Sequence, residues 1–163
     1  MRLNTWLPPV LFCSFALSEA TALASQTAGQ ESTNRAGWVT AGVGLGTHGF
    51  AGALDASYQR GANLFSLRFA GLVPIEGSGF IDYGLMYGRA TRLRRIHAGI
   101  SIGLGIAREC EVECFVTVGA IPIAARVAAR GRVLGIGLYL FGDLNAQQSF
   151  AGLVLALNIG KHY

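Results

Sequence analysis

A glycine-rich segment at residues 44–49 is the first part of the chain whose residue types could do chemistry. Its letters, GLGTHG, match the G-x-G-x-x-G pattern that binds dinucleotides. Such a site also needs a helix directly after the glycines and an acidic residue about 20 positions further on. No aspartate or glutamate lies between Asp55 and Glu76, and no further strand–helix–strand unit follows. We therefore interpret the segment as a glycine-rich hairpin turn and predict no nucleotide cofactor.

His97 and Ser101 are the second candidate, because a histidine that activates a serine is a common arrangement in nucleophilic catalysis. The surrounding sequence alternates apolar and small residues, which is typical of a β-strand. Residues four apart on one strand are separated by ~13 Å, at ~3.3 Å per residue. A base cannot activate a nucleophile over that distance, so the spacing does not predict a catalytic pair.

Three charged residues, Asp55, Arg68 and Asp82, lie on the small-residue face of three successive predicted strands. Asp143 and Asn158 are further polar candidates for the same face. A charge that is removed from water must be paired, so we predict that Arg68 is held between Asp55 and Asp82. The alternative interpretation is a ring of charges that selects ions in a channel.

An acidic loop at residues 108–114 carries three glutamates at alternate positions and two cysteines, namely Glu109, Glu111, Glu113, Cys110 and Cys114. The loop could bind a divalent cation or a partner protein, and the competing interpretation is an ordinary solvated loop. Two thiols without a matching His or Cys pair do not complete a tetrahedral metal shell, so we predict no metal site. In an exported protein we expect Cys110 and Cys114 to form a small loop-closing disulfide.

The elements that must position these residues are strands, and the clearest covers residues 96–106. Isoleucine, leucine or alanine stands at every even position of this stretch, and His, Gly or Ser at every odd position. Successive side chains of a strand point to opposite faces, so one face is wholly apolar. The same alternation predicts eight strands, at about 38–45, 51–59, 64–72, 80–89, 96–106, 115–128, 134–144 and 150–161. In the sixth, the apolar phase changes at Pro122, which predicts a β-bulge.

The composition favours a barrel that crosses a membrane. Of the 163 residues, 52% are hydrophobic and only 13% are charged, against a usual ~25% charged. No internal stretch reaches ~18 uninterrupted apolar residues, so no transmembrane helix is predicted. In lipid only helices and closed barrels pair every backbone amide, and eight strands of roughly ten residues suit a small barrel. Such a barrel encloses little more than side-chain volume, so we expect the charged cluster to plug it.

Residues 1–24 have the features of a secretory signal peptide. Arg2 supplies a positive start, an apolar run follows at 6–17, and the segment 22–24 (ALA) fits the small-x-small rule for cleavage. The run is too short to cross a membrane, and two prolines interrupt it. The polar residues 25–36 are predicted to be a flexible leader, which leaves 37–163 for the barrel.

Charged and aromatic residues are distributed unevenly between the two ends of the predicted strands. Basic residues stand at the two chain ends and at every second connection, namely Arg35, Arg60, Arg89, Arg92, Arg94, Arg95, Arg130, Arg132 and Lys161. The other connections carry Glu76, the acidic loop and Asp143, with Arg108 as the main exception. In an up-and-down barrel these sets lie on opposite rims. We predict an interfacial aromatic girdle on the apolar face near the basic rim, made of Trp38, Tyr58, Phe65, Tyr87 and Tyr163.

In these features the chain resembles the small eight-stranded outer-membrane β-barrels of Gram-negative bacteria, of the OmpA or OmpX type. The resemblance is architectural and covers residues 37–163. The alternating segment 155–163 is similar to the assembly signal of that class and ends in Tyr163, although Lys161 departs from it. The resemblance implies an outer-membrane location among lipids, with both termini in the periplasm.

We therefore predict an all-β, eight-stranded, antiparallel up-and-down transmembrane barrel that is monomeric and has no cofactor. Its predicted role is non-enzymatic, either structural or in surface interaction, with the acidic loop 108–114 as the contact for a ligand or protein. One alternative is a soluble periplasmic barrel that holds an apolar ligand among inward-facing large side chains. Another is an enzyme that modifies lipid A. No nucleic-acid binding is predicted, because anionic phospholipid headgroups are a sufficient partner for the arginines.

Overall fold

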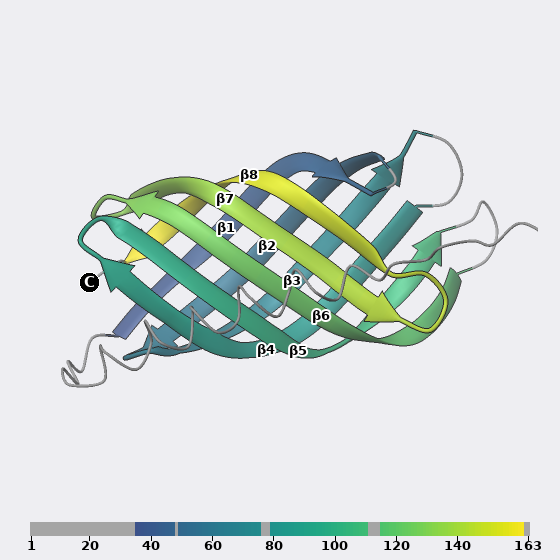
Figure 1. Ribbon diagram of the computed structural model, residues 1–163, viewed down its shortest axis with the longest axis horizontal. Coiled ribbons are helices and arrows are strands. Elements are labelled where there is room, and N and C mark those ends of the chain that lie inside the picture. Colours follow the sequence, from purple (N-terminus) through teal and green to yellow (C-terminus); the bar gives the residue numbers. More distant parts are fainter. Residues whose placement is uncertain (1–34, 48, 76–78, 111–114, 162–163) are drawn as a thin grey trace, which may run out of the picture. The chain divides into compact units, whose positions relative to one another are not determined.

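A computed structural model describes residues 35–47, 49–75, 79–110 and 115–161, and they form one closed barrel of eight antiparallel strands. Each strand pairs with its neighbours in sequence, and β8 pairs with β1 to close the barrel. The strands run obliquely around the barrel (Figure 1). They are β1 (Arg35–Gly46), β2 (Gly49–Arg60), β3 (Asn63–Pro74), β4 (Gly79–Leu93), β5 (Ile96–Cys110), β6 (Phe115–Arg130), β7 (Leu134–Asn145) and β8 (Phe150–Lys161). The predicted fold class is confirmed.

The connections alternate between the two ends of the barrel because every strand reverses direction. At the end where β1 begins and β8 ends, two of the turns contain only residues 61–62 and 94–95. Both use a backbone with positive φ, 60° at Gly61 and 53° at Arg94, which tight hairpin turns require. We call this end the basic rim, after its exposed cations Arg35, Arg60, Arg92, Arg94, Arg95, Arg132 and Lys161. The opposite end is called the loop rim.

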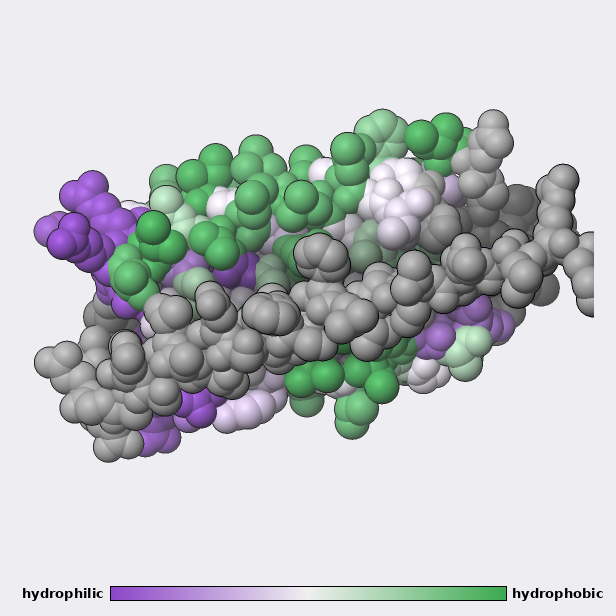
Figure 2. Space-filling view, in the orientation of Figure 1, coloured by the Kyte–Doolittle hydropathy of each residue, from purple (hydrophilic) through white to green (hydrophobic). Residues whose placement is uncertain are grey.

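The large apolar side chains point outward, as the alternation predicts. Leu104 is 77% exposed and Val43 is 75% exposed, and Figure 2 shows hydrophobic side chains over the middle of the barrel with hydrophilic ones at its ends. A soluble sheet would expose polar residues instead, whereas a transmembrane barrel presents an apolar band to lipid. The alternative with large side chains gathered inside is therefore wrong. The described residues include no helix that is long and apolar enough to cross a membrane.

Small residues on the inner face let neighbouring strands and their side chains fit within a narrow barrel. At Gly103 an added Cβ atom would lie only 2.8 Å from Met86 Cα on β4, which is closer than real Cβ contacts allow. Inward-facing alanines lie at comparable positions on other strands, for example Ala70 and Ala124, which are both buried. Close packing therefore limits the size of the side chain at each position of the inner face.

The β-bulge predicted at Pro122 is wrong. β6 pairs Ile123 with Ile102 and Ala120 with Gly105 in one continuous register, so neither strand gains a residue. Side chains also alternate normally, with Pro122 buried between the exposed Ile121 and Ile123. The proline instead leaves a local gap in the β5–β6 ladder, because proline has no N–H to donate. The sequence suggested a change of alternation because, near the loop rim, apolar residues also occupy positions of the inner face.

The predicted N-terminal divisions fall mostly outside the described residues. This applies to the signal peptide 1–24 and to residues 25–34 of the leader. Arg35 and Ala36, which we assigned to the leader, are instead the first residues of β1. Their cross-strand partners on β2 are Arg60 and Gln59, so the barrel begins two residues earlier than the composition indicates.

Candidate functional site

The barrel interior collects most of the residues that could do chemistry. Strand alternation turns them inward, and each is at most 9% exposed. The buried polar residues are Thr40, Asp55, Ser57, Ser66, Arg68, Asp82, His97, Ser101, Arg126, Arg130, Asp143 and Asn158. Burial of this many polar groups is tolerable only where charges are paired, and two arginines organise the pairing.

Arg68 crosses the interior from β3 to the opposite wall. Its guanidinium forms an ion pair with Asp82 on β4, with the Nε donating to Oδ1 at 3.2 Å. It also donates to the carbonyl oxygens of Ile123 on β6, at 2.9 Å, and Gly142 on β7, at 3.1 Å. Asp143 Oδ2 lies 3.9 Å from the same guanidinium. Arg68 therefore links four strands and occupies the axis of the barrel.

Arg126 crosses in the opposite direction, from β6 to β2. Its guanidinium forms a two-pronged ion pair with Asp55, at 2.9 and 3.2 Å, and donates to Ser57 Oγ at 2.7 Å. The Ser57 hydroxyl in turn donates to Asp55. Two-pronged arginine–carboxylate pairs are strong and restrict geometry. The Arg126 guanidinium also lies 5.1 Å from the ring centre of Tyr139, and that of Arg68 lies 5.6 Å from Phe141.

The three charged residues predicted to pair are all in the interior, but the pairing differs. Arg68 does pair with Asp82, whereas Asp55 pairs with Arg126 although Asp55 and Arg68 are direct cross-strand partners. Arg126 is an additional member of this cluster that was not predicted. The alternation of side chains along β6 could have revealed it. Arg126 is an even number of positions from the inward-facing Ala124 and Ala128, and it is adjacent to the outward-facing Val127.

A second interior group lies at the basic rim and contains Trp38, which we had assigned to the aromatic girdle. That assignment is wrong, because Trp38 is only 3% exposed and lies inside. Its ring packs edge-on against His97 at 5.1 Å, and the Arg130 guanidinium lies 3.9 Å from its centre, a cation–π arrangement. His97 Nε2 is hydrogen-bonded to Gln59 Oε1 at 2.9 Å. Trp38 is two positions from the inward-facing Thr40 and therefore points to the same face of β1. Its position in the alternation, and not its aromatic character, decides that it faces inward.

Aromatic side chains fill the interior toward the loop rim. Phe80 and Phe150 stack at 5.7 Å between ring centres, and Phe141 meets Phe150 edge-on at 6.5 Å. Aromatic rings and ion pairs therefore both contribute to the buried interior of the barrel.

A further interior hydrogen bond joins the two strands that close the barrel, β1 and β8. The Thr40 hydroxyl donates to Asn158 Oδ1 at 2.7 Å.

Three of the five predicted girdle residues point outward near the basic rim. Tyr58, Phe65 and Tyr87 are 44–49% exposed, and the rings of Phe65 and Tyr87 are 5.2 Å apart. The Tyr87 hydroxyl donates to Asn63 Oδ1 at 2.8 Å. Tyr163 lies outside the described residues.

Among the described residues, the other sequence candidates form no catalytic or metal-binding arrangement. The glycine-rich segment forms the ends of β1 and β2, with no helix after it. His97 bonds to Gln59 and not to Ser101. Cys110 ends β5, while Cys114, Glu111 and Glu113 lie outside the described residues. No group of three or more metal-ligating side chains occurs among the residues that the structure covers.

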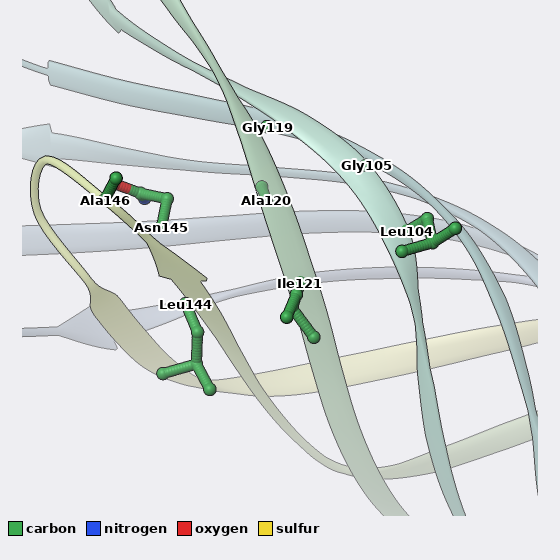
Figure 3. A pocket seen from close by; sticks show the side chains of 8 residues that line it. All are labelled: Leu104, Gly105, Gly119, Ala120, Ile121, Leu144, Asn145 and Ala146. Carbon is green, nitrogen blue, oxygen red and sulfur yellow. The ribbon is translucent and has the colours of Figure 1, made fainter.

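The outer surface carries two shallow grooves, one near each rim. The groove at the loop rim has a volume of about 580 Å³. Figure 3 shows the side chains of Leu104, Ile121 and Leu144 beside it, with Gly105 and Gly119 leaving room between them. The second groove lies near the basic rim on β8, β1, β2, β3 and β4, with a volume of about 540 Å³. Both lie on the apolar face.

Comparison with solved structures places this chain among small barrels. Neisserial surface protein A aligns with a TM-score of 0.60 at 7% identity, over 77% of this chain and 96% of that one. The N-terminal β-barrel domain of Pseudomonas aeruginosa OprF gives 0.60 at 10% identity, over 77% and 96%. The outer membrane enzyme PagL gives 0.46 at 13% identity, over 75% and 98%. No protein-family model and no curated protein sequence matches the chain. At these identities the likeness concerns the fold, and at that level the expected resemblance to small outer-membrane barrels is confirmed.

Proposed function

We propose that the protein is a non-enzymatic outer-membrane barrel with a plugged interior, and that its role is structural or in interaction at the cell surface. The observation that carries this proposal is the pair of arginines that cross the lumen in opposite directions, Arg68 to Asp82 and Arg126 to Asp55. Stacked aromatic rings lie beside both. Eight strands enclose little more than side-chain volume, so these groups are sufficient to block ion flow.

Conductance measurements test the plug directly. We expect Arg68→Ala to lower the thermal stability of the barrel without raising ion conductance in planar lipid bilayers, because the surrounding side chains still fill the lumen. Leu67→Ala, which truncates the adjacent outward-facing residue, is the matched control and should leave conductance unchanged. Stable conductance of the wild-type protein would favour the channel alternative.

The absence of enzymatic activity is supported by the surroundings of His97. Its Nε2 is engaged by Gln59 inside the barrel, and both His97 and Ser101 are at most 5% exposed, so neither side chain faces the lipid in which lipid A would lie. Mass spectra of lipid A from cells with and without the protein should be identical. A new lipid A species that disappears in a His97→Ala variant would support the enzyme alternative.

Orientation follows from turn length. Outer-membrane barrels have short periplasmic turns and longer extracellular loops, and the turns at the basic rim are short. The basic rim would therefore lie in the periplasm, beside the phospholipid leaflet. Cysteines introduced singly at Arg94 and at Gln148 test this in intact cells. In a background that carries Cys110→Ser and Cys114→Ser, a membrane-impermeant thiol reagent should label only the variant at position 148, and labelling at position 94 alone would reverse the orientation.

A further inference from the structure

The groove near the basic rim differs from its surroundings because two outward-facing positions are small. Gly37 pairs with Tyr58, and Ala56 pairs with Val39, across the β1–β2 ladder. The small residues Gly37 and Ala56 therefore each lie opposite a large side chain, which leaves a depression between the two strands. We call this feature the basic-rim groove, and its main lining residues are Gly37, Val39, Ala56, Tyr58, Phe65 and Ile159. The groove is shallow and open, with a volume of about 540 Å³, so it suits one side of an extended chain better than an enclosed ligand.

Three cations form the next outward-facing row beyond the groove. Arg35 and Arg60 are direct cross-strand partners on β1 and β2, and Lys161 on β8 pairs with Gly37 on β1. All three are exposed and in phase with the outward-facing residues that line the groove. Val39 lies four positions after Arg35, which is ~13 Å at ~3.3 Å per residue. A cluster of positive charges therefore lies at one end of the apolar basic-rim groove.

The groove at the loop rim provides an internal comparison. It has similar volume and an apolar lining, yet among the described residues Arg108 is the one basic side chain near that rim. The charge cluster is thus particular to the basic-rim groove. An apolar ligand alone would need no such cluster, whereas an amphipathic anion would use both parts.

We propose that the basic-rim groove binds an anionic phospholipid, with one acyl chain in the groove and the headgroup phosphate held by Arg35, Arg60 and Lys161. This inference rests on the proposed orientation, which puts the groove in the phospholipid leaflet. Arginine and lysine bind phosphate through charge-assisted hydrogen bonds. Tyr58 and Phe65 stand where aromatic residues anchor barrels at the membrane interface.

The test is native mass spectrometry of the full protein, purified from membranes in detergent and titrated with phosphatidylglycerol or phosphatidylethanolamine of identical acyl chains. A hydrogen bond between charged groups contributes roughly tenfold or more to affinity, and only the cations that contact the headgroup phosphate can form one. We expect the combined variant Arg35→Gln, Arg60→Gln, Lys161→Gln to lose roughly a hundredfold in phosphatidylglycerol affinity. The control Arg92→Gln, Arg94→Gln, Arg95→Gln removes three cations from the same rim and should stay within about threefold of the wild type.

A second pair of variants tests the groove itself. A Cβ at Gly37 would lie 3.8 Å from Ser57 O, an ordinary contact, and at Gly119 nothing lies within 4 Å. Both positions therefore accept a side chain without strain. Gly37→Leu fills the basic-rim groove and should lower phosphatidylglycerol affinity about tenfold, while Gly119→Leu fills the groove at the loop rim and should change it less than threefold.

Each contrary result overturns the inference. Equal losses in both arginine variants would mean that general rim charge attracts lipid, and equal losses in both leucine variants would mean that any surface groove serves. Equal affinity of the wild type for the two lipids would remove the anion preference. These outcomes leave the plugged, non-enzymatic barrel intact, whereas a conducting wild-type protein with normal lipid binding would reject the plug and keep the lipid site.

Discussion

Ile102 and Gly103 are consecutive residues of β5, and they meet opposite requirements. Ile102 faces outward and is 56% exposed, so any apolar side chain of moderate size suits its position. Gly103 faces inward, where even one added carbon would lie 2.8 Å from Met86 Cα. The outer face is thus specified by hydrophobicity alone, and the inner face by shape and charge at each position. Substitutions on the two faces should therefore differ in size and in cause.

The largest effect is expected for Gly103→Arg. Neither the first carbon of the side chain nor its charge can be accommodated beside β4 without separating the strands. We expect no folded barrel, which is measured as loss of the heat-modifiable band on gels after refolding in detergent. A Gly103→Arg protein that still shows this band would mean that the inner face is less closely packed than described.

Loss of a buried charge partner should come next. Asp55→Ala leaves the Arg126 guanidinium in the lumen without its carboxylate, which typically costs about 3–5 kcal/mol in the free energy of unfolding. Adding Arg126→Met should recover most of that loss, because a well-packed apolar replacement of a buried pair is often nearly neutral. Urea unfolding in lipid vesicles measures both. A double variant as unstable as Asp55→Ala would show that the pair contributes more than mutual neutralisation.

A charge on the outer face should cost less, and the cost should depend on depth. Ile102→Arg places a cation near the middle of the apolar band and is expected to cost about 2–4 kcal/mol, whereas Ile96→Arg, at the start of β5 near the basic rim, should cost about 0–1 kcal/mol. The same urea unfolding assay compares them. Equal costs at the two positions would contradict a membrane-spanning band.

The smallest effects separate neighbours on β8. Leu155 is 59% exposed and Val154 is fully buried. Leu155→Ile changes only the shape of a lipid-facing side chain and should stay within about 0.5 kcal/mol of the wild type. Val154→Ile adds one carbon to a filled interior and should cost about 1–3 kcal/mol. Similar values for the two would remove the distinction between the faces.

The strand pattern and the outward face could be predicted from the sequence because they depend on alternation alone. The placement of Asp55, Arg68 and Asp82 on neighbouring strands could also be predicted, although the register, with Asp55 opposite Arg68 and Asp82 opposite Ala70, could not. The choice of ion-pair partner could not, because an arginine long enough to cross a narrow lumen is not limited to adjacent strands, and Arg68 reaches β6 and β7.

Trp38 and Pro122 show two different errors of interpretation. For Trp38, residue type was given more weight than phase, although Val39 beside it faces outward. For Pro122, inward-facing apolar residues near the loop rim were taken as a phase change, because alternation does not reveal where the lipid-facing band ends. Both positions are explained once the height of each residue along its strand is known.

The hydrogen bond between Thr40 and Asn158 joins residues 118 positions apart in the chain. Its two strands are the first and the last of the barrel to be synthesised, so β1 has no partner on one side until β8 is available. Pairing between such distant segments is slow, because loop-closure entropy must be overcome first. Until then the sheet has two open edges, which are prone to aggregation. Assembly of this protein therefore depends on a late closing step, and a chain that lacks β8 would retain both edges permanently.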